Sequence, residues 1–181
     1  MIIGLVGKTS SGKSTIAKEL DTIGLHKIVT TTTRPPRKGE VDGVDYHFIS
    51  ESEFKRLQKE GAFIETTQYN VASGATWYYG TRKSDLETGT VIILNPDGLK
   101  TFRKKEIDML VFYITCSEGV MRNRLKLRGD DPAEAERRIK ADKIDFRGVA
   151  GLADLTINNE GNMTARKVAN IINNVYEECT K

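Results

Sequence analysis

An eight-residue segment near the start of the chain combines glycines, a lysine and a serine at a spacing suited to phosphate. Gly7-Lys8-Thr9-Ser10-Ser11-Gly12-Lys13-Ser14 matches G-x-x-x-x-G-K-S at every fixed position. An apolar run at 2–6 precedes it, and a helix is expected over about 13–21. Glycines let consecutive backbone N–H groups curl around phosphate oxygens, and the helix N-terminus adds the positive end of its dipole. The segment therefore predicts a nucleoside triphosphate site of the P-loop type.

Two side chains of this segment have distinct expected roles. Lys13 is expected to reach the β- and γ-phosphates, and the Ser14 hydroxyl is expected to hold Mg²⁺. The predicted triphosphate-binding residues of the segment are Gly7, Lys8, Thr9, Ser10, Ser11, Gly12, Lys13, Ser14 and Thr15.

A second cluster lies between residues 32 and 48, where Arg34 and Arg37 stand three apart on a proline-stiffened stretch and Tyr46 follows. Planar guanidinium groups match phosphate oxygens bidentately, and prolines reduce the entropy lost in holding them there. The same composition is typical of a solvated basic loop. The residue types alone leave both interpretations open.

The spacing within this cluster resembles the guanylate kinase signature T-T-R-x-P-R-x-G-E-x-x-G-x-D-Y-x-F, which is matched at every fixed position from Thr32 to Phe48. Further landmarks follow in order at 63–65, 78–81, 124–129, 138 and 157–159, so the resemblance covers nearly the whole chain. It implies a nucleoside monophosphate kinase that transfers the γ-phosphoryl of ATP to GMP or dGMP, with Mg²⁺. It also implies a P-loop NTPase-type fold.

The resemblance assigns an acceptor site residue by residue. Arg34, Arg37, Tyr46 and Tyr79 would hold the phosphate of GMP. Glu65 would accept hydrogen bonds from the guanine N1–H and 2-amino group, two adjacent donors that adenine does not offer. Hydroxyls at Thr30 and Thr81 would read the base, and Asp97 would complete the GMP site.

The resemblance also assigns donor-side residues. Arg124, Arg128 and Arg138 would clamp the transferring phosphoryl group, with Arg137 as the alternative to Arg138, and Asn158 would lie near the adenine of ATP. Such cations suit phosphoryl transfer, which is mostly positioning and electrostatic stabilisation. The expected catalytic set is Lys13, Arg34, Arg128 and Arg138.

The chain departs from the family pattern at two places. Asn95 stands where the family has an aspartate, and the loop at 68–76 is expected to be long, with extra material at 71–75. These departures support one alternative, a kinase of the same fold acting on another (deoxy)nucleoside monophosphate or a phosphorylated sugar. A second alternative is a non-catalytic guanylate-kinase-like binding module. Such modules typically lose the lysine that is intact here as Lys13.

The elements that must position these residues alternate between short apolar strands and helices, which predicts an α/β fold with a parallel sheet. We expect a core of residues 1–33, 82–127 and 139–181, an inserted α+β monophosphate-binding lobe at 34–81, and a short helical lid at 128–138. Strands are expected at 2–6, 27–33, 46–48, 62–66, 77–79, 91–94, 108–114 and 155–157. Helices are expected at 13–21, 50–61, 82–87, 97–105, 117–127, from about 133, and at 163–178.

Composition narrows the class of protein further. The chain has 181 residues, 38% of them hydrophobic, and two cysteines, which are too few for a disulfide scaffold. No apolar run approaches the ~20 residues of a membrane span, and the first residues do not resemble a signal peptide. A net charge of +3 suits an anionic ligand but does not indicate nucleic acid. We therefore expect a cytoplasmic monomer or homodimer that binds nucleotides and neither nucleic acid nor membrane.

Overall fold

The chain folds into two compact units in the computed structural model, which describes residues 1–37, 39–70 and 74–181. Unit 1 comprises Met1–Lys27, Thr88–Lys100 and Asp108–Lys181, and unit 2 comprises Ile28–Glu87 and Thr101–Ile107. The stretch expected to be a monophosphate-binding lobe, 34–81, lies within unit 2. The expected lid, 128–138, lies within unit 1.

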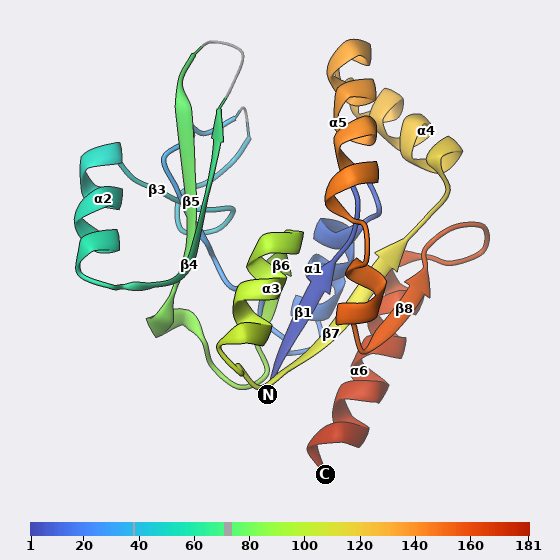
Figure 1. Cartoon of the computed structure of the whole chain (residues 1–181). Helices are drawn as coiled ribbons and strands as arrows, with labels where there is room; N and C mark the ends of the chain where they lie inside the picture. Colours follow the sequence, from blue (N-terminus) through green and yellow to red (C-terminus); the bar gives the residue numbers. More distant parts are fainter. Residues whose placement is uncertain (38, 71–73) are drawn as a thin grey trace. The chain divides into compact units, whose positions relative to one another are not determined.

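Unit 1 is built on a parallel sheet, as expected. Its strands lie in the order β6 (Val91–Leu94), β1 (Ile2–Val6), β7 (Met109–Thr115) and β8 (Leu155–Asn158), and all neighbours are parallel (Figure 1). The strands are short apolar runs because a parallel sheet is covered on both faces. β1 leads into the glycine-rich segment, and β7 and β8 end at the same edge of the sheet. The α/β prediction is confirmed.

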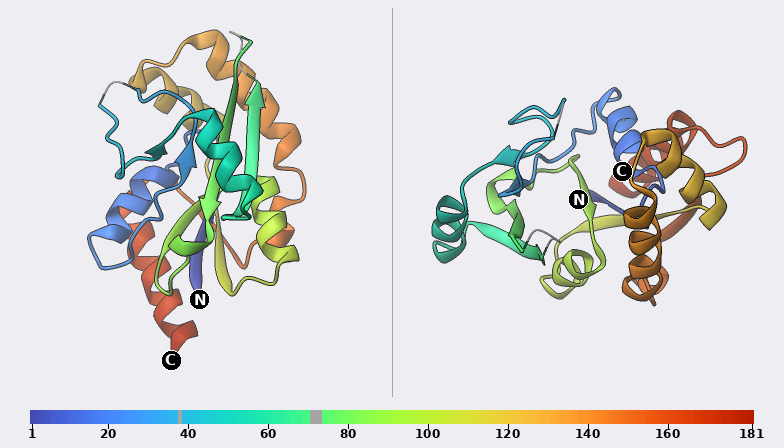
Figure 2. Two further views of the ribbon diagram at one scale, coloured as in Figure 1. Left: turned by 90° about the vertical axis from the view of Figure 1, so that its left-hand side faces the viewer. Right: turned by 90° about the horizontal axis from the view of Figure 1, so that it is seen from above.

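Helices α1 (Lys13–Asp21) and α6 (Ala165–Thr180) pack together against one face of this sheet (Figure 2). Alternate residues of each strand point to that face, and Leu5, Phe112 and Ile157 contribute to the shared core. Tyr113, which points to the opposite face, stacks on Phe146 with 6.1 Å between ring centroids. The end of the helix that precedes Phe146 therefore lies on that opposite face.

That helix is α5 (Pro132–Asp145), and it packs on α4 (Glu118–Arg128) through a small apolar cluster of Met121, Leu125, Ala135 and Ile139. Gly129 ends α4 in a left-handed conformation. The 3₁₀ helix η2 (Val149–Leu152) follows α5. Helix α3 (Pro96–Lys104) begins in unit 1, and its last residues belong to unit 2.

Unit 2 contains a mixed sheet in the order β3 (His47–Phe48), β2 (Thr31–Thr32), β5 (Thr76–Arg82) and β4 (Phe63–Asn70). Helix α2 (Glu51–Lys59), capped by Ser50, buries Phe54, whose ring stacks on Phe63 with centroids 4.6 Å apart. The 3₁₀ helix η1 (Lys83–Asp85) follows β5. Unit 2 is thus an α+β unit with one long antiparallel hairpin.

Two expectations about strand lengths in these units are wrong. The β-branched run at 27–33 forms a strand only at Thr31–Thr32 in unit 2, and Lys27, the last residue of its segment of unit 1, makes an isolated bridge to Val91 of the same unit. Both ends of the loop expected at 68–76 are strand, at residues 68–70 and 76, since cross-strand pairing continues to the pair Asn70↔Thr76. Of the extra material expected at 71–75, residues 71–73 lie outside the described residues.

In the part of the chain that the structure describes, we find no helix with both the length and the apolar character that crossing a membrane requires.

Candidate active site

The glycine-rich segment forms a tight loop between β1 and α1. Ser10 and Gly12 adopt left-handed conformations with φ of 53° and 101°. A Cβ on Gly12 would lie 2.3 Å from Nδ2 of Asn159, and one on Gly7 would lie 2.3 Å from the carbonyl oxygen of Ile114. Both glycines are therefore required by close approach of neighbouring groups, and at Gly12 by φ as well.

The ammonium group of Lys13 donates hydrogen bonds back to the start of this loop. Its Nζ donates to the carbonyl oxygens of Gly7 and Lys8 over 2.6 and 2.9 Å. Burial lowers the pKa of Lys13 to about 8, although the negative charge of Asp142 acts in the opposite direction. Burial thus opposes the charged form of Lys13, and an anion bound beside it would favour that form.

Two side chains from other parts of unit 1 donate hydrogen bonds to carbonyl oxygens of the loop. Asn159, which follows β8, donates from Nδ2 to the carbonyl of Ser11 over 2.8 Å. Arg124 of α4 donates to the carbonyls of Ser10 and Asn159 over 3.1 and 2.7 Å. Carbonyl oxygens would repel a phosphate, so holding them in these hydrogen bonds supports an anion-binding loop.

A cavity of about 430 Å³ opens beside the loop. Its lining residues are Ser10, Gly12, Lys13, Ser14, Thr15, Arg124, Arg128, Asn159, Met163 and Ala165. The structure therefore gathers most of the expected donor-side residues around one cavity within unit 1.

The asparagine at this cavity is Asn159, whereas the sequence-based assignment named Asn158. Asn158 is exposed, and its amide donates to Glu160 over 3.2 Å. Successive side chains at the end of a strand point to opposite sides, so only one of two adjacent asparagines can face the loop. The sequence offered one signal: Asn159 lies two residues after the apolar Ile157 and therefore on the same side of the strand, whereas Asn158 lies on the other side. The sequence does not show on which of these sides the glycine-rich loop lies.

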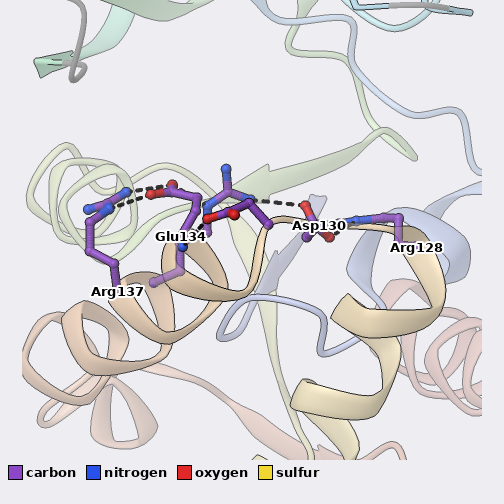
Figure 3. Close-up of polar contacts among 6 residues, drawn as sticks. Arg128, Asp130, Glu134 and Arg137 are labelled. Atoms are coloured by element: carbon purple, nitrogen blue, oxygen red, sulfur yellow. Dashed lines mark hydrogen bonds and ion pairs between the residues drawn. The ribbon is translucent and has the colours of Figure 1, made fainter.

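The arginines near the α4–α5 turn take part in a network of ion pairs (Figure 3). Nε of Arg128 lies 2.5 Å from Asp130, and Arg138 lies 2.8 Å from Glu134 and 3.7 Å from Asp130. Arg137 pairs with Glu134 over 2.7 Å. The side chain of Arg137 is 66% exposed and that of Arg138 is 30% exposed. Arg138 is therefore the better placed of the two to contact a phosphate that is shielded from solvent. Asp130 and Glu134 were not among the sequence-based site residues.

Within unit 2, the guanidinium of Arg34 is buried at the base of the arginine-rich loop. It donates to Glu40 over 2.8 Å and lies over the ring of Tyr46, 5.3 Å from its centroid. Glu40 also accepts the backbone N–H of Arg37 over 2.7 Å. The hydrogen bond from Arg34 holds the pKa of Glu40 below its usual value. Glu40, which sequence reasoning left without a role, thus organises the loop that carries both arginines.

The two tyrosines expected at the acceptor phosphate lie together in this unit. The rings of Tyr46 and Tyr79 meet edge to face with centroids 6.0 Å apart. Arg34 and Tyr46 are in contact, as above, while Arg37 is exposed. The structure therefore brings Arg34, Tyr46 and Tyr79 together, with Arg37 on the same loop.

Glu65 and Thr81 are paired across the hairpin of β4 and β5. The Thr81 hydroxyl donates to Oε1 of Glu65 over 2.7 Å. Burial raises the pKa of Glu65 although this hydrogen bond acts in the opposite direction. Thr30 is half-buried just before β2. Thr67 also donates a hydrogen bond to this carboxylate. The two oxygens of a carboxylate have about four acceptor positions, so Glu65 retains positions for a ligand that offers two adjacent donors.

Asp97 and Asn95 lie at the start of α3 in unit 1. Asp97 is 81% exposed and pairs with Lys100 over 3.0 Å. Asn95 accepts the backbone N–H of Gly98 on its Oδ1 over 2.7 Å, which caps the first turn of a helix that begins at Pro96. Asn95 therefore serves as a helix cap, a role that the aspartate of the family pattern would fill equally well.

Comparisons with known proteins identify the family of this chain. A family model for guanylate kinase matches residues 1–175. The guanylate kinase of Caldanaerobacter subterraneus subsp. tengcongensis is 34% identical over 189 residues, spanning 99% of this chain and 88% of its own. That of Sulfurimonas denitrificans is 37% identical, spanning 94% and 85%. The crystal structure of guanylate kinase from Anaplasma phagocytophilum matches with a TM-score of 0.67 at 27% identity, covering 98% of this chain and 85% of that one. The chain belongs to the guanylate kinase family.

Proposed function

We propose that this enzyme transfers the γ-phosphoryl group of ATP to GMP or dGMP, giving ADP and GDP or dGDP. The observation that carries the proposal is Lys13 in an intact phosphate-binding loop beside the 430 Å³ cavity of unit 1. A non-catalytic binding module would not need this lysine. The family assignment supports the same reaction.

The donor site of the proposal is the cavity beside the loop. Lys13 would contact the β- and γ-phosphates, and Arg124 and Arg128 of α4, which also line the cavity, would add positive charge. The adenine would lie toward Asn159, the asparagine that lines the cavity. Arg138 would contribute its guanidinium after giving up its pairs with Glu134 and Asp130. In this proposal residues 128–138 serve as the lid.

The Mg²⁺ that accompanies ATP fits the donor set of this site. Ser14 lines the cavity in the first turn of α1. Among the described residues there is no group of three or more His, Cys, Asp or Glu side chains that could hold a metal ion. Mg²⁺ often takes few protein ligands and the rest from phosphates and water, so Ser14 and the nucleotide would hold it. When bound, the ion would neutralise phosphate charge and help to orient the transferring group.

The acceptor site of the proposal belongs to unit 2. Arg34, Arg37, Tyr46 and Tyr79 would hold the phosphate of GMP. Glu65 would accept the guanine N1–H and 2-amino hydrogens, with Thr30 and Thr81 completing the recognition of the base. Residues 34–81 would thus form the monophosphate-binding lobe. Four further points are predictions from the sequence: a role of Asp97 at the GMP site, a cytoplasmic location, a place in purine nucleotide metabolism, and a monomeric or homodimeric state.

The proposal is tested with an ADP-release assay over a panel of monophosphates: GMP, dGMP, IMP, AMP, CMP and UMP. We expect rapid ADP release with GMP and dGMP, an intermediate rate with IMP, which lacks the 2-amino group, and little with the others. Lys13→Met is the inactive control, with turnover lower by about 100-fold or more. A preference for AMP, or full activity of Lys13→Met, would contradict the proposal.

A further inference from the structure

A carboxylate from α5 reaches the phosphate-binding loop. Oδ2 of Asp142 accepts a hydrogen bond from the backbone N–H of Thr9 over 2.5 Å, although the residues are 133 positions apart. Both belong to unit 1. The helix comes this close because the ring of Phe146, one turn after Asp142, stacks on Tyr113 of β7. The proposed reaction gives Asp142 no task.

The surroundings of Asp142 are those expected around a bound phosphate. The carboxylate interacts electrostatically with Lys13 and Lys8 of the loop, and also with Asp145 on its own helix. Tyr113 of β7 faces it as well. Backbone N–H groups and lysines of a phosphate-binding loop are anion ligands. Asp142 therefore supplies an anion from the chain itself to groups that would otherwise bind one from a nucleotide.

Burial disfavours the ionised form of Asp142 at this position. It raises the pKa of Asp142, even though the hydrogen bond from Thr9 and the charge of Lys13 act in the opposite direction. The ionised side chain is thus not strongly stabilised where it lies. A phosphate that approached Lys13 would also place like charge beside it.

We propose that Asp142 is an internal competitor of the donor nucleotide, whose carboxylate occupies the Thr9 N–H and faces Lys13 until the phosphates of the nucleotide displace it. The proposal rests on the proposed function, because it takes the loop of residues 7–14 as the donor phosphate site. It assigns Asp142 a role in setting nucleotide affinity, distinct from any contact with the reacting atoms.

The position of Asp142 on α5 also connects this displacement to the arginine network. Arg138 lies four residues earlier on the same helix, one turn away, and is paired with Glu134 and Asp130. Carboxylates therefore neutralise cationic groups at both places along α5. A nucleotide that displaced Asp142 would break the hydrogen bond between α5 and the backbone of Thr9. This bond lies one helical turn from Arg138, which the proposed reaction uses.

Calorimetric titration with ADP and, separately, with inorganic pyrophosphate tests the proposal on the full chain. Asp142→Asn keeps an oxygen that can accept the Thr9 N–H and removes the charge, whereas Asp142→Ala removes both. Asp145→Asn is the matched control, because it removes an exposed carboxylate from the same helix. We expect both Asp142 variants to bind ADP and pyrophosphate at least about fivefold more tightly than the unmodified chain. The control should bind at most slightly more tightly.

Thermal unfolding provides a second measurement that does not depend on turnover. Without ligand, Asp142→Ala should unfold at a lower temperature than the unmodified chain, because a charge-assisted hydrogen bond is lost. At saturating ADP the difference should shrink, because the nucleotide would already have displaced the carboxylate. Asp142→Asn carries the affinity test if the alanine variant does not fold.

Two outcomes would overturn the inference: unchanged or weaker binding of both ligands by Asp142→Asn, or an equal gain in Asp145→Asn, which would indicate a general charge effect. Lys13→Met separates failure of this inference from failure of the proposed function. If Lys13→Met binds pyrophosphate like the unmodified chain, the donor site itself is misassigned. If it loses binding while the Asp142 variants remain unchanged, only the competition is rejected.

Discussion

The hydroxyl of Thr81 donates a hydrogen bond to Oε1 of Glu65, 2.7 Å away, across paired positions of β4 and β5. Thr81 is buried, so this bond fixes one oxygen of the half-buried carboxylate. The orientation of Glu65 is thereby set before any base arrives. Such preorganisation is what a site needs to distinguish guanine from adenine by hydrogen bonding.

Replacing Glu65 should therefore remove base selectivity more than it changes the fold. Glu65→Gln presents an N–H₂ group to guanine donors, and we expect kcat/KM for GMP to fall by about 100-fold. Activity with AMP should stay low but fall much less. Steady-state kinetics with both substrates measures the ratio. Glu60→Gln, an exposed position at the end of α2, is the control and should behave as wild type. An unchanged GMP preference in Glu65→Gln would exclude this role.

Glu40 should be needed to hold the arginine-rich loop in shape. It receives the Arg34 guanidinium and the Arg37 N–H, and Arg34 is only 3% exposed. Glu40→Gln leaves a buried guanidinium with a neutral partner, so we expect a loss of about 2 kcal/mol in unfolding free energy and a KM for GMP raised about tenfold. Denaturant unfolding and kinetics measure the two effects. A raised KM for ATP with an unchanged KM for GMP would be inconsistent with this assignment.

The paired substitutions Arg138→Lys and Arg137→Lys should resolve which adjacent arginine acts in phosphoryl transfer. Arg138 is more shielded and bridges two carboxylates, whereas Arg137 is exposed beside Glu134. Lysine cannot form the planar bidentate contact with phosphate. We expect Arg138→Lys to lower kcat by about 100-fold and Arg137→Lys to stay within about threefold of wild type. The reverse order would assign the role to Arg137.

The buried charge of Lys13 should make unfolding free energy depend on pH above neutrality. Its pKa is about 8 in the folded chain, against an ordinary 10.5. Below pH 8 both folded and unfolded chains carry the charge, so the folded chain bears the full burial cost. Between pH 8 and 10.5 the folded chain loses the proton first, and stability attributable to Lys13 rises.

Lys13→Met should therefore be more stable than the unmodified chain at pH 7, by at most about 3 kcal/mol. That advantage should shrink steadily from pH 8 to pH 10.5. Comparing denaturant unfolding of the two chains at each pH cancels the titration of other groups. A constant difference across this range would show that the charge of Lys13 is not the cause.

Asn95 should contribute to stability through its cap on α3. Asn95→Ala removes the acceptor of the Gly98 N–H and should lower unfolding free energy by about 1 kcal/mol. Asn95→Asp restores the family residue and keeps a good cap, so stability should stay within about 0.5 kcal/mol. Equal losses in both variants, measured by denaturant unfolding, would rule out the cap as the contribution.

The phosphate-binding loop and the class of fold could be predicted from local patterns in the sequence. Residues 7–14 are contiguous, and their conformation follows from glycines placed between an apolar strand and a helix. The parallel sheet followed from short apolar strands alternating with helices, because such strands must be covered on both faces. The signature from Thr32 to Phe48 marked Arg34, Arg37 and Tyr46 in one short stretch. Local patterns carry this information without reference to distant residues.

Which side chains from distant parts of the chain meet could be seen only in the folded structure. Asn159 rather than Asn158 holds the loop, and Asp142 reaches Thr9 from 133 positions away. The pairing of Glu65 with Thr81 depends on the register of a hairpin whose strands extend further than their propensities indicated. These contacts are set by the order of strands in the sheet and the packing of helices on its faces, and a linear pattern of residue types does not encode which side chains then meet.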